Sequence, residues 1–405
     1  MATEPVNVLL VGCGMMGLRH VRGMGELERA EPGCLRLAAV CDARPEMAQR
    51  AADETEELLG ARPAVFTSIE EALGSAAELD AADLVTDPRS HEALAVTLME
   101  AGLDVLCEKP LAPTVARCRR MVEAAERTGR TLAVAENNRR SPVNRLARAC
   151  LDGGLIGQPN FVLELGVHPA DRIVATAWRH RRAQGGLLLD VAVHCGYILE
   201  YLLGPLARVS ATAQTVQAAR SGKEWDGAEV AVEVDAEDCF TATLEFESGA
   251  QGHWTAHFAS GGETVFKRLL IGGEGSLSVA SDRSGGSPVL RRGGETLDDE
   301  QILEALPDYR LNAIETKLFG ERPASFSLDG PVTDRKLLAA EFHDFIDAVR
   351  CGRPPESDGR QGLRAVAIVM AILESAHAGR PVAMDEVVNG ALHTYQDTVE
   401  AATTA

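Results

Sequence analysis

Short apolar runs alternate with longer amphipathic stretches over the first 136 residues of the chain. The apolar runs lie at Val6–Val11, Leu35–Cys41, Leu84–Thr86, Val105–Cys107 and Leu132–Ala135. The stretches with helical spacing lie at Met15–Ala30, Pro45–Leu59, His91–Ala101 and Thr114–Thr128. Because apolar strands separated by helices are typical of a parallel sheet covered on both faces, this pattern predicts a doubly wound Rossmann fold. Such a sheet binds its ligand at the carboxyl ends of its strands.

The pattern changes after residue 136. Ser141 and Pro142 predict a helix start, and that helix runs to about Leu151. Residues 159–168 look extended, and residues 187–203 predict an apolar helix. Six longer strands follow, at Arg208–Val216, Ala228–Val234, Phe240–Phe246, Gly252–Phe258, Val265–Ile271 and Ser276–Val279. Because short turns join these strands, we expect a large, mostly antiparallel sheet.

The last third of the chain begins with a stretch rich in Gly, Pro, Ser and Asp. We interpret this stretch, residues 281–331, mainly as an inserted loop, and expect helices at Asp334–Arg350 and Arg360–Ala378. A chain of 405 residues is too long for one core, which favours two domains. We therefore expect a Rossmann domain over residues 1–136 and an α/β domain over residues 137–405.

Composition narrows the classes of function. Hydrophobic residues make up 45% and charged residues 25%, as in a soluble globular protein. The net charge of -20 disfavours nucleic acid as a partner. No apolar run approaches the ~20 residues that span a bilayer, and the first residues lack a basic signal region, so we expect a cytoplasmic protein without a membrane partner. The nine cysteines are scattered singly, and no residues have the spacing of a metal site, so we expect reduced thiols and no metal.

A glycine-rich loop follows the first predicted strand and opens the first helix. It reads Gly12-Cys13-Gly14-Met15-Met16-Gly17. One glycine makes the tight turn, one lets the backbone approach a pyrophosphate, and one lets helix and strand pack closely. The helix N-terminus adds free N–H groups for the anion. This spacing is weak evidence alone, but at the first strand–helix junction it predicts a nicotinamide dinucleotide site.

Asp42 ends the second predicted strand. A carboxylate at this position can bind the ribose hydroxyls and would repel a 2′-phosphate, which favours NAD over NADP. Arg44, two residues later, could weaken that preference by pairing with a phosphate. The alternative role for Asp42 is to cap the turn before Pro45.

Two further clusters carry chemistry. Lys109, in Glu108-Lys109-Pro110 at a strand end, could stand near the nicotinamide and donate to a substrate oxygen, or it could be an ordinary surface lysine. Asp190 and His194 are four residues apart on one face of an apolar helix. They are either a mutually satisfied pair in the core, which spacing alone favours, or a carboxylate that orients substrate and a base that removes a hydroxyl proton.

Several motifs in order resemble the Gfo/Idh/MocA family of oxidoreductases, which includes glucose–fructose oxidoreductase and inositol dehydrogenases. After the glycine loop the matching pieces are Thr86-Asp87-Pro88-Arg89-Ser90-His91, Glu108-Lys109-Pro110, Ala135 to Pro142, Trp178-Arg179, Gly185-Gly186, Asp190-x-x-x-His194, Glu341-Phe342-x-x-Phe345 and Arg353-Pro354-Pro355. The resemblance covers nearly the whole chain and is weakest over residues 281–331. The chain departs from it modestly, at Asp87, Asn138 and Leu187-Leu188.

The resemblance implies roles for individual residues. Lys109 matches the active-site lysine, His194 the acid/base, and Asp190 the carboxylate that binds substrate hydroxyls. Glu108 matches the cofactor-side residue of its motif. We also expect cofactor contacts at Gly12, Gly14, Met15, Met16, Gly17, Asp42, Arg44, Thr86, Pro88, His91, Lys109 and Asn137, although turn stabilisation is the favoured role of His91. Further substrate contacts are expected at Arg139, Trp178 and Arg179.

The resemblance also implies a reaction and an assembly. We expect reversible oxidation of a sugar or cyclitol hydroxyl, with hydride moving to the nicotinamide and the proton to His194 with help from Lys109. The open sheet of the second domain commonly forms the oligomer interface, so we expect a homodimer or homotetramer. The alternatives are a lyase or hydrolase that uses NAD transiently, and a dinucleotide-binding regulator without turnover.

Two histidine- or arginine-rich features remain open. Residues 179–182, Arg-His-Arg-Arg, could bind an anionic substrate, but a solvated basic loop is the favoured interpretation. His253 and His257 share one face of a predicted strand and could line the pocket, meet a partner subunit or face solvent.

Overall fold

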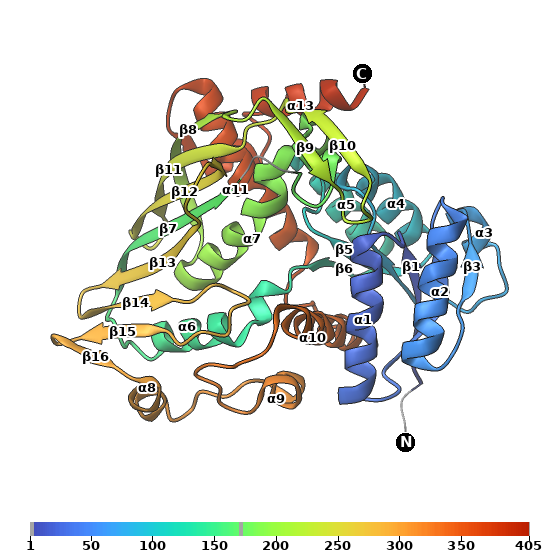
Figure 1. Cartoon of the computed structure of the whole chain (residues 1–405), viewed down its shortest axis with the longest axis horizontal. Helices are drawn as coiled ribbons and strands as arrows, with labels where there is room; N and C mark the ends of the chain where they lie inside the picture. Colours follow the sequence, from blue (N-terminus) through green and yellow to red (C-terminus); the bar gives the residue numbers. More distant parts are fainter. Residues whose placement is uncertain (1–3, 170–172, 405) are drawn as a thin grey trace.

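The five predicted apolar runs and one short strand that the sequence did not predict, β3 (Ala64–Phe66), form a six-stranded parallel sheet with helices on both faces (Figure 1). The computed structural model describes residues 4–169 and 173–404. The strand order is β3-β2-β1-β4-β5-β6, so the order reverses between β1 and β4, where a doubly wound sheet binds its ligand. The strands are β1 (Val6–Val11), β2 (Leu35–Cys41), β3 (Ala64–Phe66), β4 (Ala81–Leu84), β5 (Asp104–Glu108) and β6 (Leu132–Ala135). The predicted Rossmann fold is confirmed.

Five helices connect these strands, and local capping explains where several of them begin. The side chains of Ser68 and Thr114 accept hydrogen bonds from backbone N–H groups in the first turns of α3 and α5. Two core clusters divide the helices between the faces: α1 and α2 cover one face, and α3 to α5 the other. The helices are α1 (Met15–Ala30), α2 (Pro45–Leu59), α3 (Ile69–Leu73), α4 (Pro88–Glu100) and α5 (Val115–Thr128).

The second sheet has nine strands in the order β16-β15-β14-β13-β7-β12-β11-β8-β17. Every neighbouring pair is antiparallel except β7 and β12, so the predicted, mostly antiparallel sheet is confirmed. One face packs on helices and the other is partly exposed. The strands are β7 (Pro159–Pro169), β8 (Leu206–Gln214), β11 (Cys239–Phe246), β12 (Gln251–Ser260), β13 (Val265–Gly272), β14 (Gly275–Val279), β15 (Val289–Arg292), β16 (Glu295–Leu297) and β17 (Val382–Ala383).

Helix α7 (Gly186–Leu203) lies between the two sheets and contains both Asp190 and His194 (Figure 1). The stretch Arg182–Leu203 is long and apolar enough to cross a membrane on length and composition. However, 72% of its most apolar window is buried inside the protein. The apolar character of this helix therefore reflects its place in the core.

The last helices return to the first sheet. Helix α10 (Gly330–Cys351) packs along α1, and its buried Phe342, Phe345 and Ile346 belong to the same core cluster as β1 and β2. Helix α11 (Gly359–Ala378) contacts α5, α7 and β8. The remaining elements are α6 (Pro142–Asp152), α12 (Met384–Val388), α13 (Thr394–Thr404) and 3₁₀ turns at Asn138–Arg140, Ala177–His180 and Arg182–Gln184.

The stretch 281–331, predicted mainly as loop, contains more regular structure than expected. It holds β15, β16, α8 (Asp299–Ala305) and α9 (Ala313–Phe319). Helix α8 begins with a capping box between Asp298 and Gln301, and its Ile302 is fully buried. These elements are short and separated by glycines and prolines, so their apolar spacing is too brief to stand out in the sequence.

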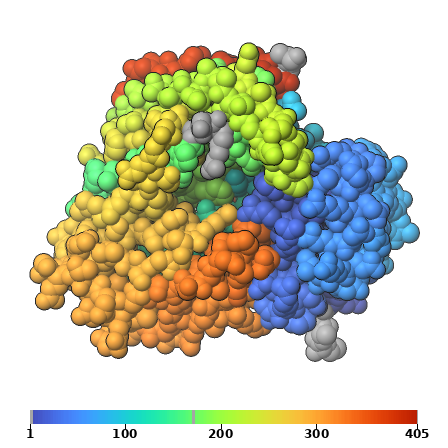
Figure 2. Space-filling model, in the orientation of Figure 1, coloured from blue at the N-terminus to red at the C-terminus, as the bar shows by residue number. Residues whose placement is uncertain are grey.

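A two-stranded hairpin stands apart from both sheets. It consists of β9 (Ala219–Lys223) and β10 (Glu229–Glu233), and only the second strand was predicted. In Figure 1 it reaches from the second domain to the start of α1. Figure 2 shows a hollow bordered by this yellow-green part of the chain and the blue Rossmann part.

Candidate active site

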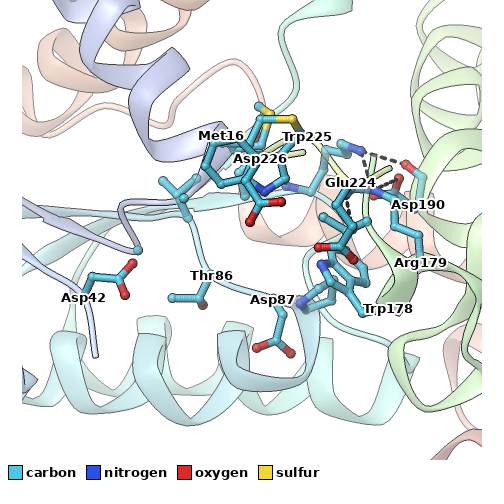
Figure 3. Close-up of a pocket in the computed structure, with 18 of the residues that line it drawn as sticks. Met16, Asp42, Thr86, Asp87, Trp178, Arg179, Asp190, Glu224, Trp225 and Asp226 are labelled. Carbon is cyan, nitrogen blue, oxygen red and sulfur yellow. Dashed lines mark hydrogen bonds and ion pairs between the residues drawn. The ribbon is translucent and has the colours of Figure 1, made fainter. Parts of the chain in front are cut away.

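A cleft of about 370 Å³ lies at the carboxyl ends of the parallel strands, between the two parts of the chain. It is lined by residues from the glycine loop, the strand ends, α7 and the β9–β10 turn (Figure 3). Thirteen residues that the sequence assigned to cofactor or substrate line it: Gly12, Gly14, Met15, Met16, Asp42, Arg44, Thr86, Pro88, Glu108, Lys109, Trp178, Arg179 and Asp190.

The three loop glycines are required for different reasons. Gly12 has φ +95°, and a Cβ there would lie 2.5 Å from the carbonyl oxygen of Val85. A Cβ on Gly17 would lie 2.1 Å from the carbonyl oxygen of Gly12, so Gly17 serves packing and does not line the cleft. A Cβ on Gly14 would meet nothing closer than an Arg44 nitrogen at 4.0 Å. The space above Gly14 is therefore open, as a loop that cradles a pyrophosphate requires.

Asp42 makes turn contacts and also lines the cleft. Its Oδ2 accepts a hydrogen bond from the backbone N–H of Cys13 at 2.8 Å, and its Oδ1 accepts one from Arg44 at 2.9 Å. The carboxylate thus ties the end of β2 to the glycine loop while it also lines the cleft. The Arg44 guanidinium is 3.7 Å from Asp42, mostly exposed, and also lines the cleft.

Lys109 and Asp190 meet in the cleft, although they are 81 residues apart in the chain. The Lys109 Nζ donates to the main-chain oxygen of Asp190 at 2.7 Å and to its Oδ1 at 3.1 Å. Arg179 donates through Nε to Asp190 Oδ2 at 2.8 Å and stacks on Trp178 at 4.4 Å. Burial raises the pKa of Asp190, but Lys109 and Arg179 outweigh it and hold that pKa well below its usual range. Asp190 is therefore ionised, and Lys109 is held in place by it.

His194 is not paired with Asp190. Its Nδ1 lies 2.6 Å from Oε2 of Glu136, a fully buried carboxylate at the end of β6. The other Glu136 oxygen accepts the backbone N–H of Asn138 at 3.0 Å. Among the described residues, Nε2 of His194 makes no hydrogen bond, and His194 itself is not part of the cleft lining. The mutually satisfied Asp190–His194 pair, which spacing alone favours, does not exist in the structure.

Glu136 lies in the motif from Ala135 to Pro142, but the sequence predicted no role for it. Its position directly after a strand, at the same sheet edge as Glu108, was the available signal, because carboxyl ends of parallel strands gather the site residues.

A buried network lies beneath Lys109. His20 on α1 contacts Asp83 through Nδ1 at 2.9 Å and Glu108 through Nε2 at 3.2 Å. The other Glu108 oxygen accepts the Lys109 backbone N–H at 2.8 Å. Burial raises the pKa of Glu108, but its hydrogen bond to His20 and the nearby charges outweigh it and lower that pKa to about 2. Glu108 thus holds the backbone at Lys109 in place and also lines the cleft.

Three other predicted residues lie outside the cleft lining. The ring nitrogens of His91 lie 3.1 Å from the carbonyl oxygens of Pro110 and Thr86, which matches the favoured turn role. Asn137 is buried and accepts a hydrogen bond from Arg283 at 3.0 Å. Arg139 stacks on Tyr201 at 4.6 Å, pairs with Glu356 at 3.0 Å and lines a different cavity, so its substrate contact stays a prediction.

The structure also shows where the remaining basic residues and histidines lie. Arg182 pairs with Glu237 at 3.3 Å, and Arg181 is exposed, so neither lines the cleft. His253 and His257 lie on the partly exposed face of β12, where they alternate with buried residues. Within the described ranges no cluster of three His, Cys, Asp or Glu side chains could hold a metal ion.

The cleft also contains residues for which the sequence predicted no contact with cofactor or substrate. They are Val85, Asp87, Thr176, Glu224, Trp225 and Asp226. Glu224, Trp225 and Asp226 form the turn of the β9–β10 hairpin and face the glycine loop across the cleft (Figure 3). A tertiary contact of this kind leaves no trace in local spacing, so the sequence had no signal for it.

A doubly wound sheet, an open glycine loop and an ion pair between Lys109 of the first domain and Asp190 of the second define a dinucleotide-dependent oxidoreductase. Residues 6–136 match the family model of the Gfo/Idh/MocA oxidoreductases described as an NAD-binding Rossmann fold, and residues 148–384 match the C-terminal α/β domain of the same family. The chain therefore belongs to this family, and the predictions of family, enzyme class and NAD as cofactor are confirmed.

Individual relatives agree with this assignment. D-apiose dehydrogenase of Paraburkholderia graminis is 26% identical over 380 residues, which span 92% of this chain and 88% of that protein. Inositol 2-dehydrogenase 2 of Saccharopolyspora erythraea is 34% identical over 275 residues, or 68% of this chain and 73% of that protein. The crystal structure of an NAD-binding oxidoreductase from Klebsiella pneumoniae has a TM-score of 0.77 and 26% identity, covering 94% of this chain and 99% of that one.

Proposed function

We propose that the protein moves a hydride reversibly between NAD and a secondary alcohol of a neutral sugar or cyclitol. The observation that carries the proposal is the meeting of Lys109 and Asp190 in the same cleft as the glycine loop. Relatives named as D-apiose dehydrogenase, inositol 2-dehydrogenase and levoglucosan dehydrogenase support the substrate class. Bound NAD supplies the hydride acceptor for the alcohol and, as NADH, the donor for the ketone.

The chain's own residues handle binding and the proton. Lys109 Nζ, oriented by Asp190, donates to the substrate oxygen and stabilises the negative charge that develops there. His194 lies one helical turn beyond the cleft-lining Asp190, and its side chain remains partly exposed. From there its Nε2 takes the hydroxyl proton, while Glu136 accepts a hydrogen bond from Nδ1–H and fixes the tautomer. The alcohol thus loses a hydride and a proton and becomes a carbonyl, which balances the reduction of the cofactor.

The charge of the cleft supports a neutral substrate over an anionic one. Six acidic side chains line it, against the three basic side chains of Arg44, Lys109 and Arg179. Two of these bases already pair with Asp190. An anionic sugar would meet this excess of negative charge next to the cofactor pyrophosphate, whereas hydroxyl groups can use the same carboxylates as acceptors.

The test is a screen of neutral sugars, inositols and matched sugar acids with NAD and NADP, monitored by NADH absorbance. We expect turnover with a neutral polyol and NAD. Lys109→Ala and His194→Ala should each lower kcat by about 100-fold or more while NAD still binds, because each removes a proton-handling group. Lys317→Ala, at a half-exposed side chain of α9 that pairs with Glu31 outside the cleft, is the matched control and should keep full turnover.

The outcomes separate the alternatives. Near-normal turnover in either active-site variant would show that the assignment is wrong. Product formation without net NADH, with tightly held cofactor, would indicate a lyase or hydrolase that uses NAD transiently. Cofactor binding without any product would indicate a regulator.

The partly exposed face of the large sheet supports assembly into a homodimer or homotetramer. Leu163, Leu165, Leu269 and Ile271 lie on this face and are only half-buried. Apolar area of this kind is typical of an interface. Size-exclusion chromatography with light scattering should give a multiple of 43.1 kDa, and a monomer at micromolar concentration would contradict the proposal. The nine free cysteines agree with a reducing cytoplasmic location.

A further inference from the structure

The β9–β10 hairpin is fixed at its base in the second domain. Arg220 is buried and donates to Asp238 Oδ2 and to the carbonyl oxygen of Phe258, both at 2.8 Å. Val232, on the opposite strand, is buried beside it. A two-stranded hairpin alone is marginally stable in water, so these base contacts are what keep it formed.

The tip of the hairpin is fixed separately, on the substrate side of the cleft. Glu224 Oε1 accepts the backbone N–H of Ala177 at 2.7 Å, and the Trp225 N–H donates to the carbonyl oxygen of Ala175 at 3.1 Å. Ala175 has φ +61° and is the one non-glycine residue with positive φ in the described ranges. The tip therefore docks on a strained loop segment.

The Trp225 side chain reaches across to the Rossmann part. It packs against the core cluster of β1, α1 and α2, as does Met16 of the glycine loop. Its neighbours Asp226, Gly227 and Ala228 are exposed, so the indole is the one large group of the turn that is directed inward. In Figure 3 the Trp225 ring lies close to Met16, above the cleft that Thr86 and Asp42 line from below.

We propose that Trp225 is a cofactor-contacting residue and that the β9–β10 hairpin must lift from the Rossmann part before NAD can enter or leave. The proposal rests on the NAD site and not on the proton roles of Lys109 and His194. The hairpin is held to the second domain at its base and by two tip hydrogen bonds, and it meets the Rossmann part through the Trp225 indole. Closing the cleft in this way excludes water from the hydride-transfer site and slows cofactor release.

The experiment measures NADH dissociation without any sugar. The protein is loaded with NADH and mixed rapidly with excess NAD, and the loss of bound-NADH fluorescence gives the dissociation rate. Trp225→Ala should raise this rate about tenfold or more, because it removes an aromatic contact to the cofactor. Glu224→Ala, which loosens the tip without touching the indole, should raise it by a smaller factor.

Two matched variants control for general damage. Trp225→Phe keeps an aromatic ring and should stay within about threefold of the unmodified protein. Lys223→Ala removes an exposed side chain of the same hairpin that pairs with Glu229, and should leave the rate unchanged. Each variant is compared by thermal unfolding to show that the fold is retained.

A Trp225→Ala protein that unfolds like the unmodified one and releases NADH within about twofold of its rate would overturn the proposal. Because no turnover is needed, failure here leaves the hydride-transfer proposal standing, and failure of that proposal leaves this one testable.

Discussion

Asp190 and His194 stand one helical turn apart, yet each is held by a different partner. Asp190 is shared by Lys109 and Arg179, and His194 is held by Glu136. The helix thus presents a fixed carboxylate and a separately oriented imidazole, so the two groups can have different tasks. This separation gives Glu136 a role of its own.

Glu136→Ala should lower kcat about 10- to 100-fold and leave the dissociation constant for NAD within about twofold, because it disturbs the tautomer of His194 and not the cofactor loop. Glu136→Gln, whose amide oxygen can still accept from Nδ1–H, should lose less. Nitrogen NMR of the histidine ring would report the tautomer directly. An Ala variant with full kcat, or with the same ring spectrum, would contradict this role.

Glu341 on α10 is a buried acid whose oxygens find no hydrogen-bond partner among the described residues. Burial raises its pKa from 4.5 to about 8, and the charge of Arg140 offsets this only in part. Between these pH values the folded protein keeps a proton that the unfolded chain has lost. The free energy of unfolding should therefore fall as pH rises from about 5 to 8.

Glu341→Gln removes the titrating carboxyl group, so the free energy of unfolding should decrease less between pH 5 and pH 8. We expect the variant to gain at least about 1 kcal/mol relative to the unmodified protein between pH 5 and pH 8, since one pKa unit corresponds to about 1.4 kcal/mol. Urea unfolding of both proteins at pH 5 and pH 8 measures this difference in the free energy of unfolding. Equal slopes for the two proteins would show that Glu341 is ionised in the folded state at neutral pH.

At the scale of elements, strands and helices with regular apolar spacing could be predicted and irregular ones could not. β3 has three residues at an exposed sheet edge, and β9 contains Arg, Ser and Gly instead of an apolar alternation. The fourth strand begins at Ala81, earlier than predicted, because Ala-Ala-Asp carries little strand preference. Motifs predicted Lys109 and Asp190, but a contact between Trp225 and the Rossmann core depends on tertiary structure and leaves no local pattern.

The glycine loop offers a paired prediction at this scale. Gly14→Ala should fold normally, because its Cβ meets open space, but should bind NAD at least about tenfold more weakly because the methyl group occupies the cradle. Gly17→Ala should instead cost about 2–4 kcal/mol of stability, because its Cβ would lie 2.1 Å from a backbone oxygen. Calorimetric titration and thermal unfolding separate the two effects. A Gly14→Ala protein with unchanged NAD affinity would place the pyrophosphate elsewhere.

At the scale of the whole molecule, the two sheets share their covering helices. Helix α10 completes the core around β1 and α1, while α11 bridges α5 and the large sheet. The domain boundary expected at residue 136 separates the strands of the two sheets. It does not separate their hydrophobic cores, because residues from both sides of the boundary share each core cluster. The chain should therefore unfold as one cooperative unit.

Phe342→Ala tests this coupling, because the ring is fully buried in the core of the Rossmann part although it lies late in the chain. It should destabilise the whole protein by about 3–5 kcal/mol in a single calorimetric transition. Leu328→Ala, at a side chain that is 37% exposed, should change stability by less than about 1 kcal/mol. Two separate transitions would indicate independent domains.

The burial of the thiols has a practical consequence. Burial raises the pKa of Cys34 and Cys41 to about 11 and that of Cys150 to about 12, whereas Cys351, at the last turn of α10, is the one exposed cysteine of the nine. A maleimide dye should thus attach at Cys351 alone without any substitution. Cys351 therefore allows site-specific labelling of the unmodified protein, on a helix that packs against the cofactor domain and at a position away from the cleft.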